Sequence, residues 1–311
     1  AIVDAVLFKL TWDSFGESYS FFVNQFYSLF FVLLATAGYQ VVKRTRAQAA
    51  ARPGASLHKQ FFIMGCLDAS GNCFGSMGAV RTPGSLQVLL RQLQIPFSMI
   101  ASYLYLKVKV GVKPMIGAAV IVLGVIIATI PDFRQHSDTS VAAYAILIFT
   151  ASTIPNSFSL VYKEGSFDKD NTDAWHMAMW VSLWQFLLGW LYLPLLSLKV
   201  FGGIALKDMP TNLSQGFQCW LGHNSQDGDN CTQTTFWLFL IYALESYFYN
   251  VAYLYVAKRG SAVLGMVATA VRLPMVTLLF SLKFVMGSHY EPFSGWTIVG
   301  LLVVLAGFLV Y

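Results

Sequence analysis

The chain has 311 residues, of which 56% are hydrophobic and only 11% are charged, against roughly 25% charged in an ordinary soluble domain. So few ionisable side chains cannot give a protein of this size a surface that is well hydrated in water. The composition therefore excludes a soluble globular protein and predicts an integral membrane protein. The net charge of +5 does not indicate a nucleic-acid partner, because the basic residues fall in short clusters between apolar blocks. The sequence starts inside an apolar stretch without an initiator Met, so we expect it to begin within a longer chain.

Ten apolar blocks predict an all-α protein with ten transmembrane helices, because crossing a hydrocarbon core of about 30 Å takes about 20 residues. The blocks are 1–11, 19–42, 60–80, 85–106, 114–131, 140–162, 174–199, 235–257, 261–282 and 294–311. The first is expected to be a truncated helix. Most connections are short, which predicts antiparallel neighbours; the long ones are 43–59 and 200–234.

Lys and Arg resist translocation, so their positions predict the orientation of the helices. With loop 43–59 in the cytoplasm, twelve basic residues fall on the cytoplasmic side and five on the other. The cytoplasmic set is Lys43, Arg44, Arg46, Arg52, Lys59, Lys107, Lys109, Lys113, Lys163, Lys169, Lys258 and Arg259, and the opposite set is Arg81, Arg134, Lys199, Lys207 and Lys283. Both termini are therefore expected in the cytoplasm, and loop 200–234 in a lumen or outside.

Loop 200–234 contains Cys219 and Cys231, and an oxidising compartment would favour a disulfide between them. It also holds two glycosylation sequons, beginning at Asn212 and Asn230, of which the second is expected to stay unused if Cys231 is bridged. No cysteine or histidine spacing in the chain predicts a zinc or haem site, and no cofactor is expected.

The second half of the sequence repeats helix-breaking residues of the first. Pro96, Pro114 and Gly117 recur 178 positions later, as Pro274, Pro292 and Gly295, and an acid in the third block, Asp68, is mirrored by Glu245 in the eighth. Two five-helix halves of opposite topology are the arrangement of many alternating-access carriers. We therefore predict a first repeat over 1–131 and a second over 140–311, the second carrying the lumenal loop.

Ionisable residues inside a membrane are costly, so each is a candidate functional residue. They are Asp4, Lys9, Asp68, Arg91, Glu245 and Arg272, with Lys163 and Glu164 at the end of the sixth block. In the functional interpretation, Asp68 or Glu245 takes up and releases a proton, while Arg91, Gln94 and Arg272 contact a substrate carboxylate or exchange with those acids. In the structural interpretation, the same charges form buried ion pairs that only fix helix packing.

Uncharged polar residues are weaker candidates for a cavity. Five of them lie inside apolar blocks: Asn72, Gln87, Gln185, Asn250 and Thr269. A single amide in a membrane helix holds two helices together by hydrogen bonding about as often as it contacts a ligand. The dense aromatics around Tyr249 and Tyr253 are expected to face lipid or to pack.

An enzyme is not expected. Asp68 follows Gly65-Cys66-Leu67, which is not the Gly-x-Gly-Asp of intramembrane aspartyl proteases, and Glu245 would be an unusual second acid. A nucleophile elbow, a His-Glu-x-x-His motif and a phosphate-binding loop are also missing from the sequence. The alternative to a transporter is a non-transporting structural subunit of a larger membrane complex, built on a carrier fold and covered by a protein partner.

Four separated motifs resemble the chloroquine resistance transporter-like family, especially its plant and algal branch, within the drug/metabolite transporter superfamily. They are Gln60-Phe61-Phe62 with Leu67-Asp68-Ala69, then Gln92-Leu93-Gln94-Ile95-Pro96, then Ile154-Pro155-Asn156-Ser157-Phe158-Ser159 with Lys163-Glu164, and finally Gly216-Phe217 with Cys219 and Cys231. The resemblance implies ten helices in inverted repeats around a central cavity, and a lumenal loop closed by disulfide chemistry between the seventh and eighth helices. It also implies proton-linked export of amino acids, small peptides or cationic amphiphiles from acidic vacuoles, or carriage of glutathione and its precursors across the plastid envelope.

Residue by residue, Asp68 and Glu245 match intramembrane acids of the family, while Lys9, Lys163 and Glu164 match charged positions near its cavity. Two departures stand out: the parasite members have four cysteines in the lumenal loop, and Glu245 replaces an Asp. We predict a secondary transporter of a vacuolar, lysosome-like or plastid membrane, coupled to protons and surrounded by lipid. Its expected substrates are small zwitterionic or cationic metabolites.

Overall fold

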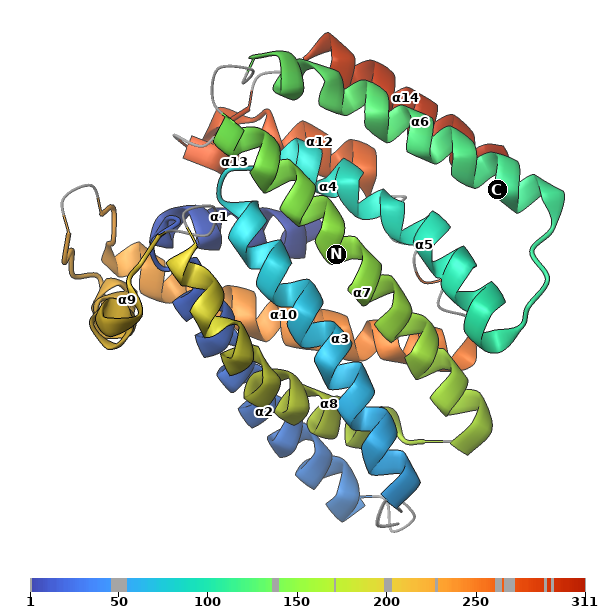
Figure 1. Ribbon diagram of the computed structural model, residues 1–311, viewed down its shortest axis with the longest axis horizontal. Helices are drawn as coiled ribbons and strands as arrows, with labels where there is room; N and C mark the ends of the chain where they lie inside the picture. Colours follow the sequence, from blue (N-terminus) through green and yellow to red (C-terminus); the bar gives the residue numbers. More distant parts are fainter. Residues whose placement is uncertain are drawn as a thin grey trace.

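The computed structural model describes residues 2–45, 55–135, 140–170, 172–198, 203–226, 229–260, 265, 272–287, 290–291 and 294–310. Every regular element within these ranges is a helix and none is a strand, which confirms the all-α prediction for the described part (Figure 1). Residues 261–264 and 266–271 of the ninth predicted block, and residues 46–54 of loop 43–59, lie outside the described residues.

The helices follow the predicted blocks closely where both can be compared. The first half contains α1 (Ile2–Phe15), α2 (Ser20–Thr45), α3 (Ala55–Ala79), the consecutive segments α4 (Gly84–Leu90), η2 (Arg91–Leu93), α5 (Gln94–Ala101) and η3 (Ser102–Leu106), and α6 (Val112–Gln135). The second half contains α7 (Ser140–Asp170), α8 (Ala174–Gly189) with η4 (Trp190–Ser197), η6 (Leu206–Asp208), α9 (Met209–Trp220), α10 (Gln233–Arg259), α12 (Leu273–Phe280), α13 (Lys283–Met286) and α14 (Gly295–Val310).

Four of the described helical stretches are long and apolar enough to cross a membrane: 20–45, 112–130, 143–167 and 174–197. The shortfall from the predicted ten has physical causes. α1 and α14 have only 14 and 16 residues, and the segment from Gly84 to Leu106 changes helix type three times. α3 and α10 interrupt their apolar faces with polar residues such as Asp68 and Glu245.

Close packing organises the bundle into pairs. α6 runs along α14, α3 packs between α7 and α8, and α1 lies against α10 (Figure 1). Glycines permit the closest of these contacts: a Cβ added at Gly300 would lie 2.7 Å from the carbonyl oxygen of Gly124, and one added at Gly307 would lie 2.7 Å from Ile121. Small residues of this kind let membrane helices approach until their backbones touch, and dispersion then stabilises the pair.

The helix connections separate into two ends of the bundle. At one end, Arg81 of the α3–α4 turn pairs with Glu17 of the α1–α2 turn, with Nε 2.7 Å from Oε2, and Asn212 of α9 donates to the carbonyl of Ser18 at 3.1 Å. At the other end, Lys258 near the end of α10 donates to the carbonyl of Thr172 in the α7–α8 turn at 2.6 Å. The described turns thus alternate as the predicted antiparallel order requires.

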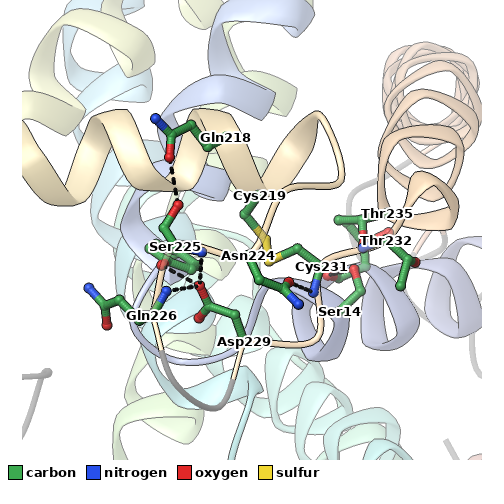
Figure 2. The surroundings of a disulfide bond; sticks show 12 residues. Ser14, Gln218, Cys219, Asn224, Ser225, Gln226, Asp229, Cys231, Thr232 and Thr235 are labelled. Atoms are coloured by element: carbon green, nitrogen blue, oxygen red, sulfur yellow. Dashed lines mark hydrogen bonds between the residues drawn. A yellow bond between two sulfur atoms is a disulfide. The ribbon is translucent and has the colours of Figure 1, made fainter.

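A disulfide joins Cys219, in the last turn of α9, to Cys231 in the connection between α9 and α10, which confirms the predicted bridge (Figure 2). Next to it, the Asn224 side chain accepts a hydrogen bond from the Cys231 backbone at 2.8 Å. Asp229 accepts from the backbone of Ser225 at 3.0 Å and from the Tyr19 hydroxyl at 2.8 Å. Burial and the nearby carboxylate raise the pKa of Tyr19 above its ordinary value, so the phenol stays protonated and donates.

The two sequons differ in accessibility. Asn212 is only 6% exposed and its amide is engaged by Ser18, whereas Asn230 is exposed beside the disulfide. The folded protein therefore presents the second sequon to solvent rather than the first.

Candidate functional site

A cavity of about 250 Å³ lies at the centre of the bundle and carries most of its intramembrane charge. Its charged lining residues are Asp4, Asp68, Arg91, Lys163 and Arg272, its amides and hydroxyls are Asn72, Gln94, Asn156, Ser182, Gln185, Ser246 and Asn250, and its tyrosines are Tyr27, Tyr242, Tyr249 and Tyr253. A second cavity of about 100 Å³ shares part of this wall. A cleft so polar inside an apolar bundle is the environment in which intramembrane charges are tolerated.

Asp68 and Lys163 form an ion pair on the cavity wall. Lys163 Nζ lies 2.6 Å from Asp68 Oδ2, and the side chains are 14% and 15% exposed. The pair forms because α3 and α7 approach closely: a Cβ added at Gly78 of α3 would lie 2.8 Å from Phe149 of α7. A carboxylate and an ammonium are thereby held together in partly desolvated surroundings, where removing either one leaves the other uncompensated.

A second pair joins the start of the chain to the ninth predicted helix. Arg272 Nη1 lies 3.8 Å from Asp4 Oδ2, and the guanidinium lies over the Tyr249 ring at 5.8 Å. Arg272 immediately precedes α12, whose second residue is Pro274. Proline in the first turn of a helix costs no hydrogen bond, so it fixes the beginning of α12 and the place of Arg272 before it.

Arg91 and Gln94 lie where the fourth predicted helix changes type. Pro96 has no backbone N–H, and the helix tightens to a 3-10 turn over Arg91–Leu93 just before it. The Arg91 guanidinium lies over the Phe8 ring at 4.8 Å and over the Phe149 ring at 5.8 Å. The break thus brings a cation and an amide from one helix onto the cavity wall.

Six of the side chains predicted for the substrate cavity line it: Asn72, Arg91, Gln94, Lys163, Asn250 and Arg272. Of the predicted proton-coupling acids, Asp68 lines the cavity, whereas Glu245 lines neither cavity. Glu164 also lines neither.

Lys9 and Gln87 lie away from the cavity lining and tie helix ends together. Lys9 Nζ donates to Asp13 Oδ1 at 2.8 Å and to the carbonyl of Val80 at 3.0 Å. Gln87 Nε2 donates to the carbonyl of Ala79 at 2.6 Å and to that of Thr82 at 2.8 Å. Both side chains satisfy carbonyls at the end of α3, which would otherwise be buried without partners.

Several lining residues were not among the predicted site residues. Asp4 was recognisable as an intramembrane charge, and Asn156 lies within a family motif next to Pro155, so both carried a signal. Tyr249 and Tyr253, which were expected to pack or to face lipid, line the cavity instead. Their pattern gave no sign of this, because tyrosine occurs throughout α10. Thr269 lies outside the described residues.

Within the described ranges, no group of three His, Cys, Asp or Glu side chains is placed to hold a metal ion.

Comparison with known proteins identifies the family. A family model described as CRT-like, chloroquine-resistance transporter-like, matches residues 1–311. The chloroquine resistance transporter of Toxoplasma gondii is 32% identical over 270 residues, which cover 81% of this chain and 30% of that protein. Crt homolog 1 of Dictyostelium discoideum is 29% identical over 333 residues, covering 98% and 70%, and Crt homolog 3 is 33% identical over 272 residues, covering 80% and 56%.

The chain thus spans less than a third of the Toxoplasma protein and just over half of Crt homolog 3. The names of these relatives are those of transporters and not of enzymes. The match along the whole sequence shows that the chain belongs to the CRT-like, chloroquine-resistance transporter-like family.

Proposed function

We propose that the chain is a secondary active transporter that moves small zwitterionic or cationic metabolites across an organelle membrane by alternating access coupled to protons. Amino acids, short peptides and glutathione-like thiols are the substrates of this kind. The observation that carries the proposal is the Asp68–Lys163 ion pair on the wall of a 250 Å³ cavity inside a bundle of apolar helices. An acid that faces such a cavity is the group by which proton movement is coupled to transport.

The coupling step follows from the pair's chemistry. When Asp68 takes up a proton, its carboxylate loses its charge and the ammonium of Lys163, 2.6 Å away, loses its partner. The Lys163 cation is then available to a substrate anion or repels a substrate cation. Proton binding and substrate binding are thereby linked through one contact between α3 and α7.

Helix packing supports the two inverted repeats that alternating access requires. With five helices in each repeat, α3 corresponds to α10, α1 to α7 and α2 to α8. α3 packs against α7 and α8, and its counterpart α10 packs against α1 and α2. α5 packs against α7 as α12 does against α1, while α6 packs against its own counterpart α14. Each contact reappears when the halves are exchanged, as a pseudo-two-fold axis demands.

The position of the cavity supports a state of such a cycle in which the cavity lies toward the cytoplasmic end of the bundle and the opposite end is closed. Its lining residues include Asp4 near the start of α1, Lys163 near the end of α7, Met177 near the start of α8 and Tyr253 near the end of α10. These helix ends lie away from the disulfide loop, at the end of the bundle that the predicted topology places in the cytoplasm. The contacts of Lys9, Gln87 and Arg81 close the opposite end.

The test is uptake into proteoliposomes under an imposed pH gradient, with amino acids, dipeptides and glutathione as substrates. We expect gradient-dependent uptake of at least one class, and its loss in Asp68→Asn, which cannot ionise. Asp208→Asn is the matched control, because Asp208 is exposed before α9 and its side chain does not cap that helix. Proton-driven uptake by Asp68→Asn at the wild-type rate would refute the coupling role, and uptake of no compound would favour a structural subunit.

A further inference from the structure

Arg91 differs from the other two cations of the cavity in having no acidic partner. Lys163 pairs with Asp68, and Arg272 pairs with Asp4. The Arg91 guanidinium makes neither a hydrogen bond nor an ion pair within the part of the chain that the structure describes, and instead lies over aromatic rings. Among the described residues, two carboxylates and three cations line the cavity, so this part of its wall carries a net charge of +1 when all five groups are ionised.

Arg91 belongs to a wall that both cavities share. Asn72, Gln94 and Asn156 line both cavities with it, and their side-chain amides make no hydrogen bond among the described residues. Amides offer both donors and acceptors, so three groups able to bind a polar ligand surround one unpaired guanidinium. Side chains that are polar, internal and uncommitted are what a binding site has and a packed core lacks.

Among the described residues, no acid lines the smaller cavity to attract a cation. Apart from Arg91, the polar residues that line it are Asn24, Asn72, Ser76, Gln94, Ser152, Thr153 and Asn156, with the phenols of Tyr27 and Tyr242 and the indole of Trp12. A carboxylate entering it would meet the guanidinium, which binds carboxylates through two parallel hydrogen bonds. An ammonium would meet the like charge of Arg91 and, among the described residues, no carboxylate to compensate its lost hydration.

We infer that Arg91 is the specificity-determining residue of the transporter: it binds a carboxylate of the transported molecule, and the amides of Asn72, Gln94 and Asn156 bind the polar group next to that carboxylate. This inference rests on the proposed function and changes its substrate class: molecules that carry only positive charge are removed, and anions that present a carboxylate are added. Zwitterions and anions that present a carboxylate are accepted, and molecules that carry only positive charge are rejected.

The experiment measures how the purified chain binds three related dipeptide probes: alanyl-alanine, its C-terminal amide and its N-acetyl derivative. The first is a zwitterion, the second a cation without a carboxylate, and the third an anion without an ammonium. Binding is read from the rise in Tm with probe concentration, which does not depend on transport. We expect the zwitterion and the anion to bind and the amide to bind at least tenfold more weakly.

In Arg91→Gln, binding of both carboxylate probes is expected to weaken about 10- to 100-fold, as for the loss of a charge-assisted hydrogen bond, while binding of the amide does not weaken. Arg91→Lys retains the charge and recovers part of the loss. Arg44→Gln is the control for removal of a guanidinium, because Arg44 is exposed in the last turn of α2.

Equal binding of the amide and the carboxylate probes by the wild type would overturn the inference, as would an unchanged preference in Arg91→Gln or binding of none of the three. The proposed function fails separately. Proton-driven uptake of the amide alone in proteoliposomes would keep the transporter and refute the role of Arg91. Arg91-dependent binding without uptake of any compound would support the role of Arg91 in binding and refute the proposed transport function.

Discussion

The carboxylate of Glu291 accepts a hydrogen bond from the backbone N–H of Ser85 at 2.9 Å and another from that of Gly84. Glu291 belongs to the second predicted repeat and Ser85 to the first, 206 residues earlier. Phe280 adds an apolar contact at the same place, because a Cβ on Gly84 would lie 2.6 Å from its ring. The helix that carries Arg91 is therefore fixed at its beginning by a residue of the other half.

Glu291→Gln should lower the stability of the protein. A glutamine has one uncharged oxygen, so one of the two N–H groups at the start of α4 loses its acceptor, and the favourable interaction of the carboxylate with the helix N-terminus is lost. The expected cost is about 1–3 kcal/mol, measured as a lower Tm in detergent. Asp208→Asn is the control, because it removes an exposed carboxylate that also stands before a helix but makes no cap hydrogen bond there; the same Tm for both variants would show that the two hydrogen bonds of Glu291 contribute nothing.

The Asp68–Lys163 pair should show strong coupling in a double-mutant cycle. Asp68→Asn leaves the Lys163 ammonium without its partner, and Lys163→Gln leaves the carboxylate, so each single variant should be less stable by about 1–3 kcal/mol. The double variant removes both charges and should lose less than the sum of the single losses. Additive losses in the free energy of unfolding would mean that the two groups do not interact, despite the 2.6 Å between them.

The positions of the helices were largely predictable, because apolar length and helix breakers report directly on membrane helices. The repeated prolines lie at local changes in the helices, because the 3-10 turn over Arg91–Leu93 precedes Pro96 and α12 begins one residue before Pro274. The predicted blocks 85–106 and 261–282 had no interruption at these places. Helix lengths were less predictable. η3 ends at Leu106, as the block 85–106 predicts, but α7 continues to Asp170, beyond the end of the apolar block 140–162. Hydropathy records which residues suit lipid, and a helix continues into water wherever its backbone hydrogen bonds are satisfied.

The site was predictable as a set of charges but not as a set of contacts. Asp68, Arg91 and Arg272 stand out because intramembrane charge is costly. Lys9 donates to carbonyls at the end of α3, whereas Lys163 faces the cavity. This difference depends on which face of each helix meets which neighbour. Hydrophobic periodicity does not specify this in α10, because polar and apolar residues are mixed around the helix near Tyr249 and Tyr253 and no face is distinctly apolar.

Gly71→Ala and Gly75→Ala are a matched pair one helical turn apart on α3. A Cβ at Gly71 would overlap the side-chain amide of Asn156, whereas one at Gly75 would lie 3.4 Å from Ser152 Oγ, an ordinary contact. Gly71→Ala should therefore displace Asn156 from the cavity wall, with a loss of about 1–3 kcal/mol in stability and weaker binding of alanyl-alanine. Gly75→Ala should change little, and indistinguishable Tm and affinity for the two variants would contradict this packing of α3 on α7.

Removing the disulfide should loosen the loop between α9 and α10 without opening the helix bundle. Cys219 and Cys231 are 12 residues apart, and closing a loop of about this size stabilises a protein by about 2–4 kcal/mol. Because the loop also depends on the Tyr19–Asp229 hydrogen bond, the double variant Cys219→Ser/Cys231→Ser should keep its fold. Amide hydrogen exchange should rise in residues 206–232 and stay unchanged in α6 and α14, whose contact lies elsewhere in the bundle. Cys66→Ser, which removes an exposed free thiol, is the control, and faster exchange throughout the bundle would mean that the bridge stabilises the whole fold rather than the loop.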